Sequence, residues 1–104
     1  MENLSQSIME LIFYAGNAKS MALQAVMKAE DNQLTEAKNM MEEAKQEIHK
    51  AHEIQTNLMT KEIQGEPIEK SILLIHSQDH FMAANTTIEL GERLIKIHEK
   101  LLEK

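Results

Sequence analysis

Residues 3–30 read NLSQSIMELIFYAGNAKSMALQAVMKAE, and this stretch decides the fold. Small and apolar residues recur in it at alternating spacings of four and three, namely Leu4, Ile8, Leu11, Ala15, Ala18, Ala22, Ala25 and Ala29. This period is typical of a helix with one buried seam, so a helix is predicted from about Asn3 to about Glu30. Alanine in the seam lets a neighbouring helix approach closely. Gly16 either serves packing or access to a site, or is tolerated at about 1 kcal/mol relative to alanine.

Two more helices follow the first. Residues 31–33 (Asp-Asn-Gln) suit a turn. A second seam then runs through Leu34, Ala37, Met41, Ala44, Ile48, Ala51, Gln55 and Leu58, with Gln55 as its polar exception. Gly65 suits the end of this helix, and Pro67 suits the start of a third that runs to about Glu103. With 104 residues, three glycines and one proline, the chain is expected to form a single all-α domain over residues 1–104.

The third helix carries two apolar stripes. One has a strict spacing of seven: Leu74, Phe81, Ile88, Ile95 and Leu102. The other is interrupted by an aspartate: Ile72, Ile75, Asp79, Met82, Thr86, Leu90, Leu94, Ile97 and Leu101. So wide an apolar face is more than two helices of the same chain easily cover. Three long antiparallel helices per chain are therefore expected to self-associate into a larger helical bundle.

Composition excludes several classes of function. The net charge of −6 and the lack of a Lys/Arg cluster argue against nucleic acid and anionic membranes as partners. Without cysteine there are no disulfides, thiolate metal sites or cysteine nucleophiles. No signal peptide and no long apolar span are visible, so a cytoplasmic protein is expected.

The segment HSQDH at residues 76–80 inserts polar groups into an apolar helix. At helical spacing His76, Asp79 and His80 lie along one side. Two histidines four apart match helical zinc sites, but Ser77 stands where a metalloprotease needs its glutamate. No Glu-x-x-His pair exists in the chain, which excludes a di-iron bundle.

Asp79 is the most unusual of these residues, because a buried unpaired carboxylate costs several kcal/mol. If third helices meet at a symmetry axis, copies of Asp79 converge there and a divalent cation such as Mg²⁺ suits their oxygens. The alternative is an aspartate that reaches solvent at the edge of the stripe. Similarly, His76 is either a nucleophile, with Gln78 and His80 holding the oxygens of a phosphoryl group, or an inert surface histidine. His49 and His52 are expected to be solvated or lightly packed, and His98 is expected to be exposed.

Three motifs together resemble a known family. Residues 75–82 (IHSQDHFM) are similar to the H-x-Q-D-H motif of the lactose/cellobiose-type enzyme IIA of the bacterial sugar phosphotransferase system. Residues 14–20 (YAGNAKS) resemble its Y-A-G-x-A-[RK]-S motif, and residues 51–56 (AHEIQT) its A-H-x-x-Q-T motif. The motifs fall one per predicted helix and in the family's order, so the resemblance covers nearly the whole chain.

The resemblance implies a homotrimer and a phosphohistidine intermediate. It implies that Nε2 of His76 accepts a phosphoryl group from HPr and passes it to a cysteine of the cognate IIB, which drives uptake of a β-disaccharide through the IIC permease. It further implies that three copies of Asp79 hold a metal ion on the symmetry axis, and that Gln78 and His80 lie near the phosphohistidine. The sugar itself is not readable from the chain, because IIA does not touch it.

Two other classes of function remain open at this point. One is a non-catalytic helical oligomerisation or regulatory module that retains the motif. The other is a metal-dependent hydrolase, which would need an activated water near His76 and His80 and has no evident general base.

Overall fold

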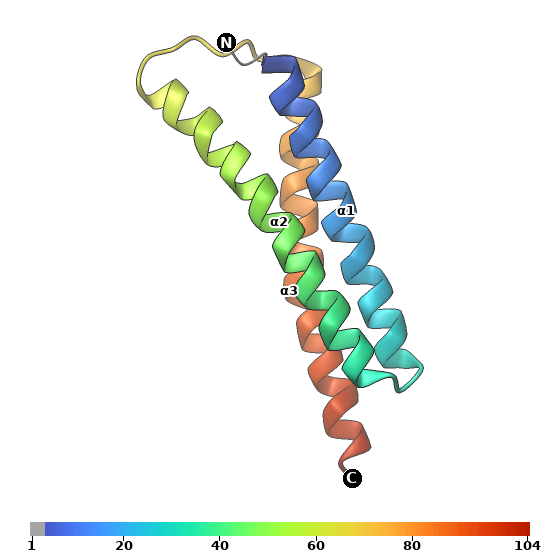
Figure 1. Ribbon diagram of the computed structural model, residues 1–104. Helices are drawn as coiled ribbons and strands as arrows, with labels where there is room; N and C mark the ends of the chain where they lie inside the picture. The colour runs from blue at the N-terminus through green and yellow to red at the C-terminus, as the bar shows by residue number, and fades with distance from the viewer. Residues whose placement is uncertain (1–3) are drawn as a thin grey trace.

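The computed structural model describes residues 4–104 as three long antiparallel helices that form an elongated bundle of 56 × 20 × 19 Å (Figure 1). Helix α1 spans Leu4–Glu30, α2 spans Leu34–Ile63 and α3 spans Ile72–Leu102. The all-α prediction with three antiparallel helices is confirmed. The predicted first residue of the first helix, Asn3, lies outside the described residues.

Both interhelical connections contain a residue in the left-handed region of backbone conformation. Asn32 has φ 63° in the turn between α1 and α2, and its amide donates to the carbonyl of Ala29 at 2.9 Å. Gly65 has φ 92° directly after α2, and its amide donates to the carbonyl of Glu62 at 3.1 Å. Asparagine and glycine adopt this conformation with the least steric cost, so the predicted turn and the predicted stop are both confirmed.

The predicted start of the third helix at Pro67 is wrong by five residues. Residues 67–71 form no regular structure, and α3 begins at Ile72. Ser71 has extended backbone angles and its Oγ accepts a hydrogen bond from the backbone amide of Leu74 at 3.1 Å, which is the arrangement of an N-cap. The segment before Ser71 crosses from the end of α2 to α3 (Figure 1).

Alanines form much of the core where the helices approach one another. Every member of the α1 seam from Ile8 to Ala29 is buried, and so are Ala37, Met41, Ala44, Ala51 and Leu58 of the α2 seam. The core is completed by Phe81, Ile88 and Ile95 of the α3 stripe with the spacing of seven residues. Leu102, at the end of that stripe, is exposed because α3 extends beyond the turn that joins the other two helices (Figure 1). The predicted seams therefore hold, apart from that last residue.

Two glycines in helices differ sharply in their surroundings. A Cβ atom on Gly91 would lie 2.8 Å from Cε of Met41 and 3.3 Å from Cγ2 of Val26, so α3 passes close to its neighbours there. A Cβ atom on Gly16 would meet nothing within 4 Å. Packing within one chain therefore calls for glycine at position 91 and gives no reason for it at position 16.

The second stripe of α3 is left uncovered. Ile72, Ile75 and Met82 are 86%, 63% and 68% exposed, and the stripe continues as exposed residues to the end of the helix with Leu90, Leu94, Ile97 and Leu101. Helix α1 has a similar exposed row at alternating spacings of four and three: Met9, Phe13, Gly16, Ser20, Leu23 and Met27, of which Gly16 is half-buried. As expected from the width of the apolar face of α3, the two other helices of the chain leave this second stripe uncovered.

Candidate functional site

The two histidines of the HSQDH segment touch each other on the outside of α3. Nε2 of His76 lies 3.0 Å from Nε2 of His80, and the rings meet edge to face with centroids 4.4 Å apart. His76 is exposed and His80 is half-buried. Such a contact needs a hydrogen on one Nε2 and a lone pair on the other. The pair thus places a nucleophilic nitrogen and a hydrogen-bond donor side by side at the surface.

Asp79 lies on the exposed stripe of α3, between Ile75 and Met82 in the row, and is itself exposed. Within residues 4–104, no three histidine, aspartate or glutamate side chains gather into a group that could hold a metal ion. The described part of one chain therefore does not form a metal site by itself around Asp79. A cation here would need ligands from further copies of the chain.

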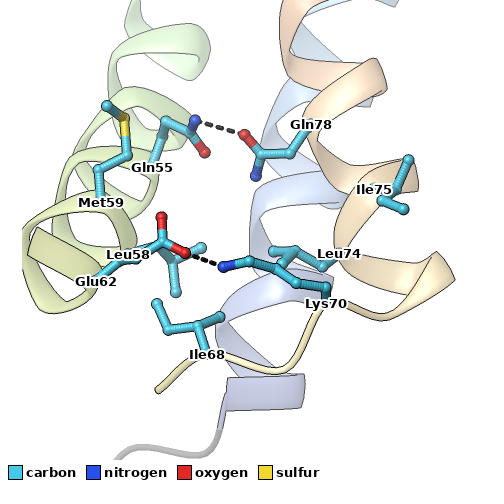
Figure 2. Close-up of a pocket in the computed structure, with 9 residues that line it drawn as sticks. All are labelled: Gln55, Leu58, Met59, Glu62, Ile68, Lys70, Leu74, Ile75 and Gln78. Atoms are coloured by element: carbon cyan, nitrogen blue, oxygen red, sulfur yellow. Dashed lines mark hydrogen bonds and ion pairs between the residues drawn. The ribbon is translucent and has the colours of Figure 1, made fainter. Parts of the chain in front are cut away.

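Gln78 points away from the histidine pair and toward α2. Figure 2 shows its side chain facing Gln55, whose Nε2 donates a hydrogen bond to Oε1 of Gln78. Nε2 of Gln78 lies 3.5 Å from Oγ of Ser77, and that buried hydroxyl donates to the carbonyl of Leu74 at 2.6 Å. The structure thus brings His76 and His80 together and directs Gln78 elsewhere.

A cavity of about 270 Å³ lies between α2, α3 and the segment that joins them (Figure 2). An exposed ion pair joins Lys70 to Glu62 across it. Oε1 of Gln55 is buried and has no hydrogen-bond partner within residues 4–104. A buried acceptor without a donor costs roughly 1–3 kcal/mol. Apart from these polar groups the lining is mainly apolar, with Leu58, Met59, Ile68, Leu74 and Ile75.

Two residues of the first motif make polar contacts with α2, just before the second motif begins. Nδ2 of Asn17 donates to Oε1 of Glu47 at 3.3 Å, and Nζ of Lys50 lies 2.9 Å from Oε2 of the same carboxylate and 5.4 Å from the centre of the Tyr14 ring. The hydrogen bond from Lys50 is the main cause that lowers the pKa of Glu47, and the same bond raises the pKa of Lys50. These contacts join the first motif to the turn of α2 that precedes the second motif.

The remaining histidines have ordinary surroundings. Nε2 of His49 lies 3.1 Å from Oε1 of Glu53, one turn further along α2. The ring of His52 stacks on Phe81 with centroids 6.1 Å apart, and His98 is half-buried rather than fully solvated. Sequence reasoning gave no role to Gln55. The signal that could have found it was its polar side chain in an otherwise apolar seam.

Together, the fold and the site describe a small three-helix protein that presents two contacting histidines on the outside of its third helix. The chain belongs to the lactose/cellobiose-specific IIA subunits of the sugar phosphotransferase system, since the model of that family matches residues 6–99. The members of this family are phosphoryl carriers for sugar uptake, and the family resemblance found in the sequence is confirmed.

Individual relatives agree with this assignment. The lichenan-specific phosphotransferase enzyme IIA component of Bacillus subtilis is 35% identical over 103 residues, which cover 99% of this chain and 94% of the relative. The lactose-specific EIIA component of Staphylococcus epidermidis is 41% identical over 91 residues, with 88% of each chain covered.

Solved structures show the same fold. The crystal structure of the cellobiose-specific enzyme IIA from Bacillus anthracis superposes with a TM-score of 0.95 at 41% identity, covering 100% of this chain and 95% of that one. The IIA(chitobiose) protein of Escherichia coli, solved in solution in complex with HPr, gives a TM-score of 0.78 at 34% identity, covering 97% and 98% of the two chains. No helix within residues 4–104 is long and apolar enough to cross a membrane.

Proposed function

We propose that this chain carries a phosphoryl group on Nε2 of His76, accepting it from HPr and passing it to the cysteine of a cognate IIB. The observation that carries the proposal is the exposed His76 with Nε2 of His80 at 3.0 Å, in a chain of the IIA family. The relative solved in complex with HPr supports HPr as the donor. The carrier would act in the cytoplasm, ahead of β-disaccharide uptake through the IIC permease.

The histidine pair suits both halves of such a transfer. The lone pair of His76 Nε2 attacks phosphorus while the bond between phosphorus and the donor breaks, and the negative charge stays on the phosphoryl oxygens. The hydrogen on Nε2 of His80 can then turn from His76 to one of those oxygens, since the two nitrogens already lie at hydrogen-bond distance. The new phosphorus–nitrogen bond breaks in turn when the IIB thiolate attacks. A role of Gln78 at the phosphoryl group remains a prediction.

Labelling with phosphoenolpyruvate, enzyme I and HPr tests this assignment. The wild-type chain should take up one labelled phosphoryl group, and His76→Gln should take up none. The matched control is His49→Gln, which removes another exposed histidine on a different helix and should keep the label. His80→Ala should slow labelling without abolishing it. The proposal would be contradicted if His76→Gln still took up label or if the wild type took up none. A trimer that accepts no phosphoryl group would indicate a regulatory module instead.

We also propose that the chain forms a homotrimer in which α3 helices meet along their exposed stripe. The large exposed apolar side chains in the rows on α3 and α1 support self-association, because monomeric proteins rarely leave so many of them open to water on one face. In that arrangement three copies of Asp79 supply only carboxylate oxygens, which fit a hard divalent cation such as Mg²⁺. The ion would offset the repulsion between these carboxylates, and it has no part in the transfer step.

Elemental analysis of the purified protein tests the metal site. The wild type should contain one divalent ion per three chains, and Asp79→Ala should contain none and associate more weakly at equal concentration. Asp31→Ala, which removes an exposed carboxylate in the turn after α1, should keep the ion. Wild-type protein that is trimeric and free of divalent metal would refute the metal site and leave the phosphoryl carrier standing.

A further inference from the structure

Gln55 occupies a position that folding alone would fill with an apolar residue. It stands in the α2 seam between the buried residues Ala51 and Leu58, and its side chain is half-buried. Its Oε1 is fully buried without a hydrogen-bond partner in the part of the chain described. A leucine or methionine would remove that unpartnered oxygen and continue the seam. Where a residue breaks its own pattern at a cost in stability, a functional reason is expected.

The one hydrogen bond that Gln55 does make leads into the turn that carries His76. Its Nε2 donates to Oε1 of Gln78 (Figure 2). Gln78 is two residues from both His76 and His80, so the helical period places it on the opposite side of α3 from the histidine pair. Next to Gln78, the hydroxyl of Ser77 is completely buried and donates to the carbonyl of Leu74. Polar contacts thus run from α2 into α3 at the level of residues 74–78.

This part of α3 has little else to fix its position against α2. The two helices diverge here (Figure 1). A cavity of about 270 Å³ lies between them (Figure 2). Ile75, at the edge of the cavity, and His76 are both exposed. The ion pair of Lys70 with Glu62 also spans the gap, but it is exposed and lies on the segment before the helix, so it holds that segment only weakly.

We propose that Gln55 is a positioning residue for phosphoryl transfer at His76 and that it acts through Gln78. This inference rests on the proposed function. The amide pair fixes the distance and the rotation of the α3 turn relative to α2, and so fixes where Nε2 of His76 meets an incoming donor. Phosphoryl transfer depends mainly on alignment of the reacting atoms. A displacement of about 1 Å caused by a distant substitution can slow a reaction on the order of 100-fold.

The test measures single-turnover transfer from phospho-HPr to four proteins: wild type, Gln55→Leu, Gln78→Leu and the double variant. Gln46→Leu is the matched control, because it makes the same substitution at an exposed site of the same helix. For Gln55→Leu the limiting rate at saturating phospho-HPr should fall by about ten- to a hundredfold, with the half-saturating concentration changed less than about twofold. Thermal unfolding of Gln55→Leu should occur at the same or a higher temperature than for wild type.

The double variant distinguishes a positioning role from a merely structural one. If Gln55 acts through Gln78, the double variant transfers as fast as Gln78→Leu alone, because the second substitution has no contact left to remove. The proposal would be overturned if the rate losses of the two single variants multiplied in the double variant. It would also be overturned if Gln55→Leu transferred as fast as Gln46→Leu, or if its lower rate were fully accounted for by the fraction of unfolded protein. If the wild type labels at His76 while Gln55→Leu is normal, this inference alone fails; if the wild type does not label, the carrier function fails with it.

Discussion

The sharpest structural prediction concerns Leu90 and Leu94 on the exposed stripe of α3. We expect the double substitution of both to lysine to convert a trimer into a folded monomer. The two side chains are 57% and 44% exposed in the single chain. Full burial of a leucine is worth about 1.5–3 kcal/mol, so covering what is still exposed contributes about 1 kcal/mol or slightly more for each.

A symmetric trimer contains three copies of each leucine, so this small burial free energy is multiplied. In a trimer six such side chains become buried, which stabilises the assembly by about 5–9 kcal/mol. Loss of that contribution weakens association on the order of 10⁴- to 10⁶-fold, before any cost of bringing lysine ammonium groups together at an axis. For a trimer the concentration of half-dissociation scales with the square root of the three-chain dissociation constant, so it should rise by roughly 10²- to 10³-fold.

Light scattering coupled to size-exclusion chromatography, with sedimentation velocity, measures the outcome. Helicity by circular dichroism should remain, because neither leucine belongs to the core of the single chain. Leu102→Lys is the control, since Leu102 is also exposed on α3 but belongs to the other stripe, and it should stay trimeric. A double variant that is folded and still trimeric would refute the assignment of this stripe to the interface.

Two further predictions concern stability. Gly16→Ala should stabilise the isolated chain by about 1 kcal/mol, because alanine favours a helix and the new methyl group meets nothing. Gly91→Ala should not stabilise it, because its methyl group would displace the end of Met41 and crowd Cγ2 of Val26. Chemical denaturation of both variants under monomeric conditions compares them, and an equal gain would contradict the packing described. The pKa of Glu47 lies below its ordinary value of 4.5, chiefly because of its hydrogen bond with Lys50. The contribution of Glu47 to stability is therefore present above pH 4.5 and is lost as the pH falls through the lower pKa of the folded state. The stability difference between wild type and Glu47→Gln should shrink below about pH 4.5, and a difference independent of pH would show that the contact is not ionic.

Much of the fold follows from periodicity alone. The seams of α1 and α2 were readable because a helix repeats its buried face every three or four residues, and the sequence places apolar or small residues there almost without exception. The start of α3 was misjudged for a local reason. Pro67 suits a first helical position, but Ser71 offers a side-chain cap just before an apolar run, and the cap determines where the helix begins.

The site was predictable in part. Spacing placed His76 and His80 on one face of α3, and their nitrogens do meet. The direction of Gln78 was not predictable, because it depends on where α2 lies around α3, and a helical period does not contain that information. The partner of Gln78 is 23 residues away in sequence, across a gap whose width is set by the bundle as a whole.

The alanine seam of α1 has a consequence for how this protein must be handled. From Ala15 to Ala29 every buried seam residue is alanine, and Leu11 and Ser77 are the largest side chains that are fully buried among residues 4–104. A core built from such small side chains removes little apolar surface from water in each chain. In a trimer, association therefore adds to the modest stability of each folded chain, and the melting temperature rises with protein concentration by mass action. Dilution of the protein would therefore lower its melting temperature.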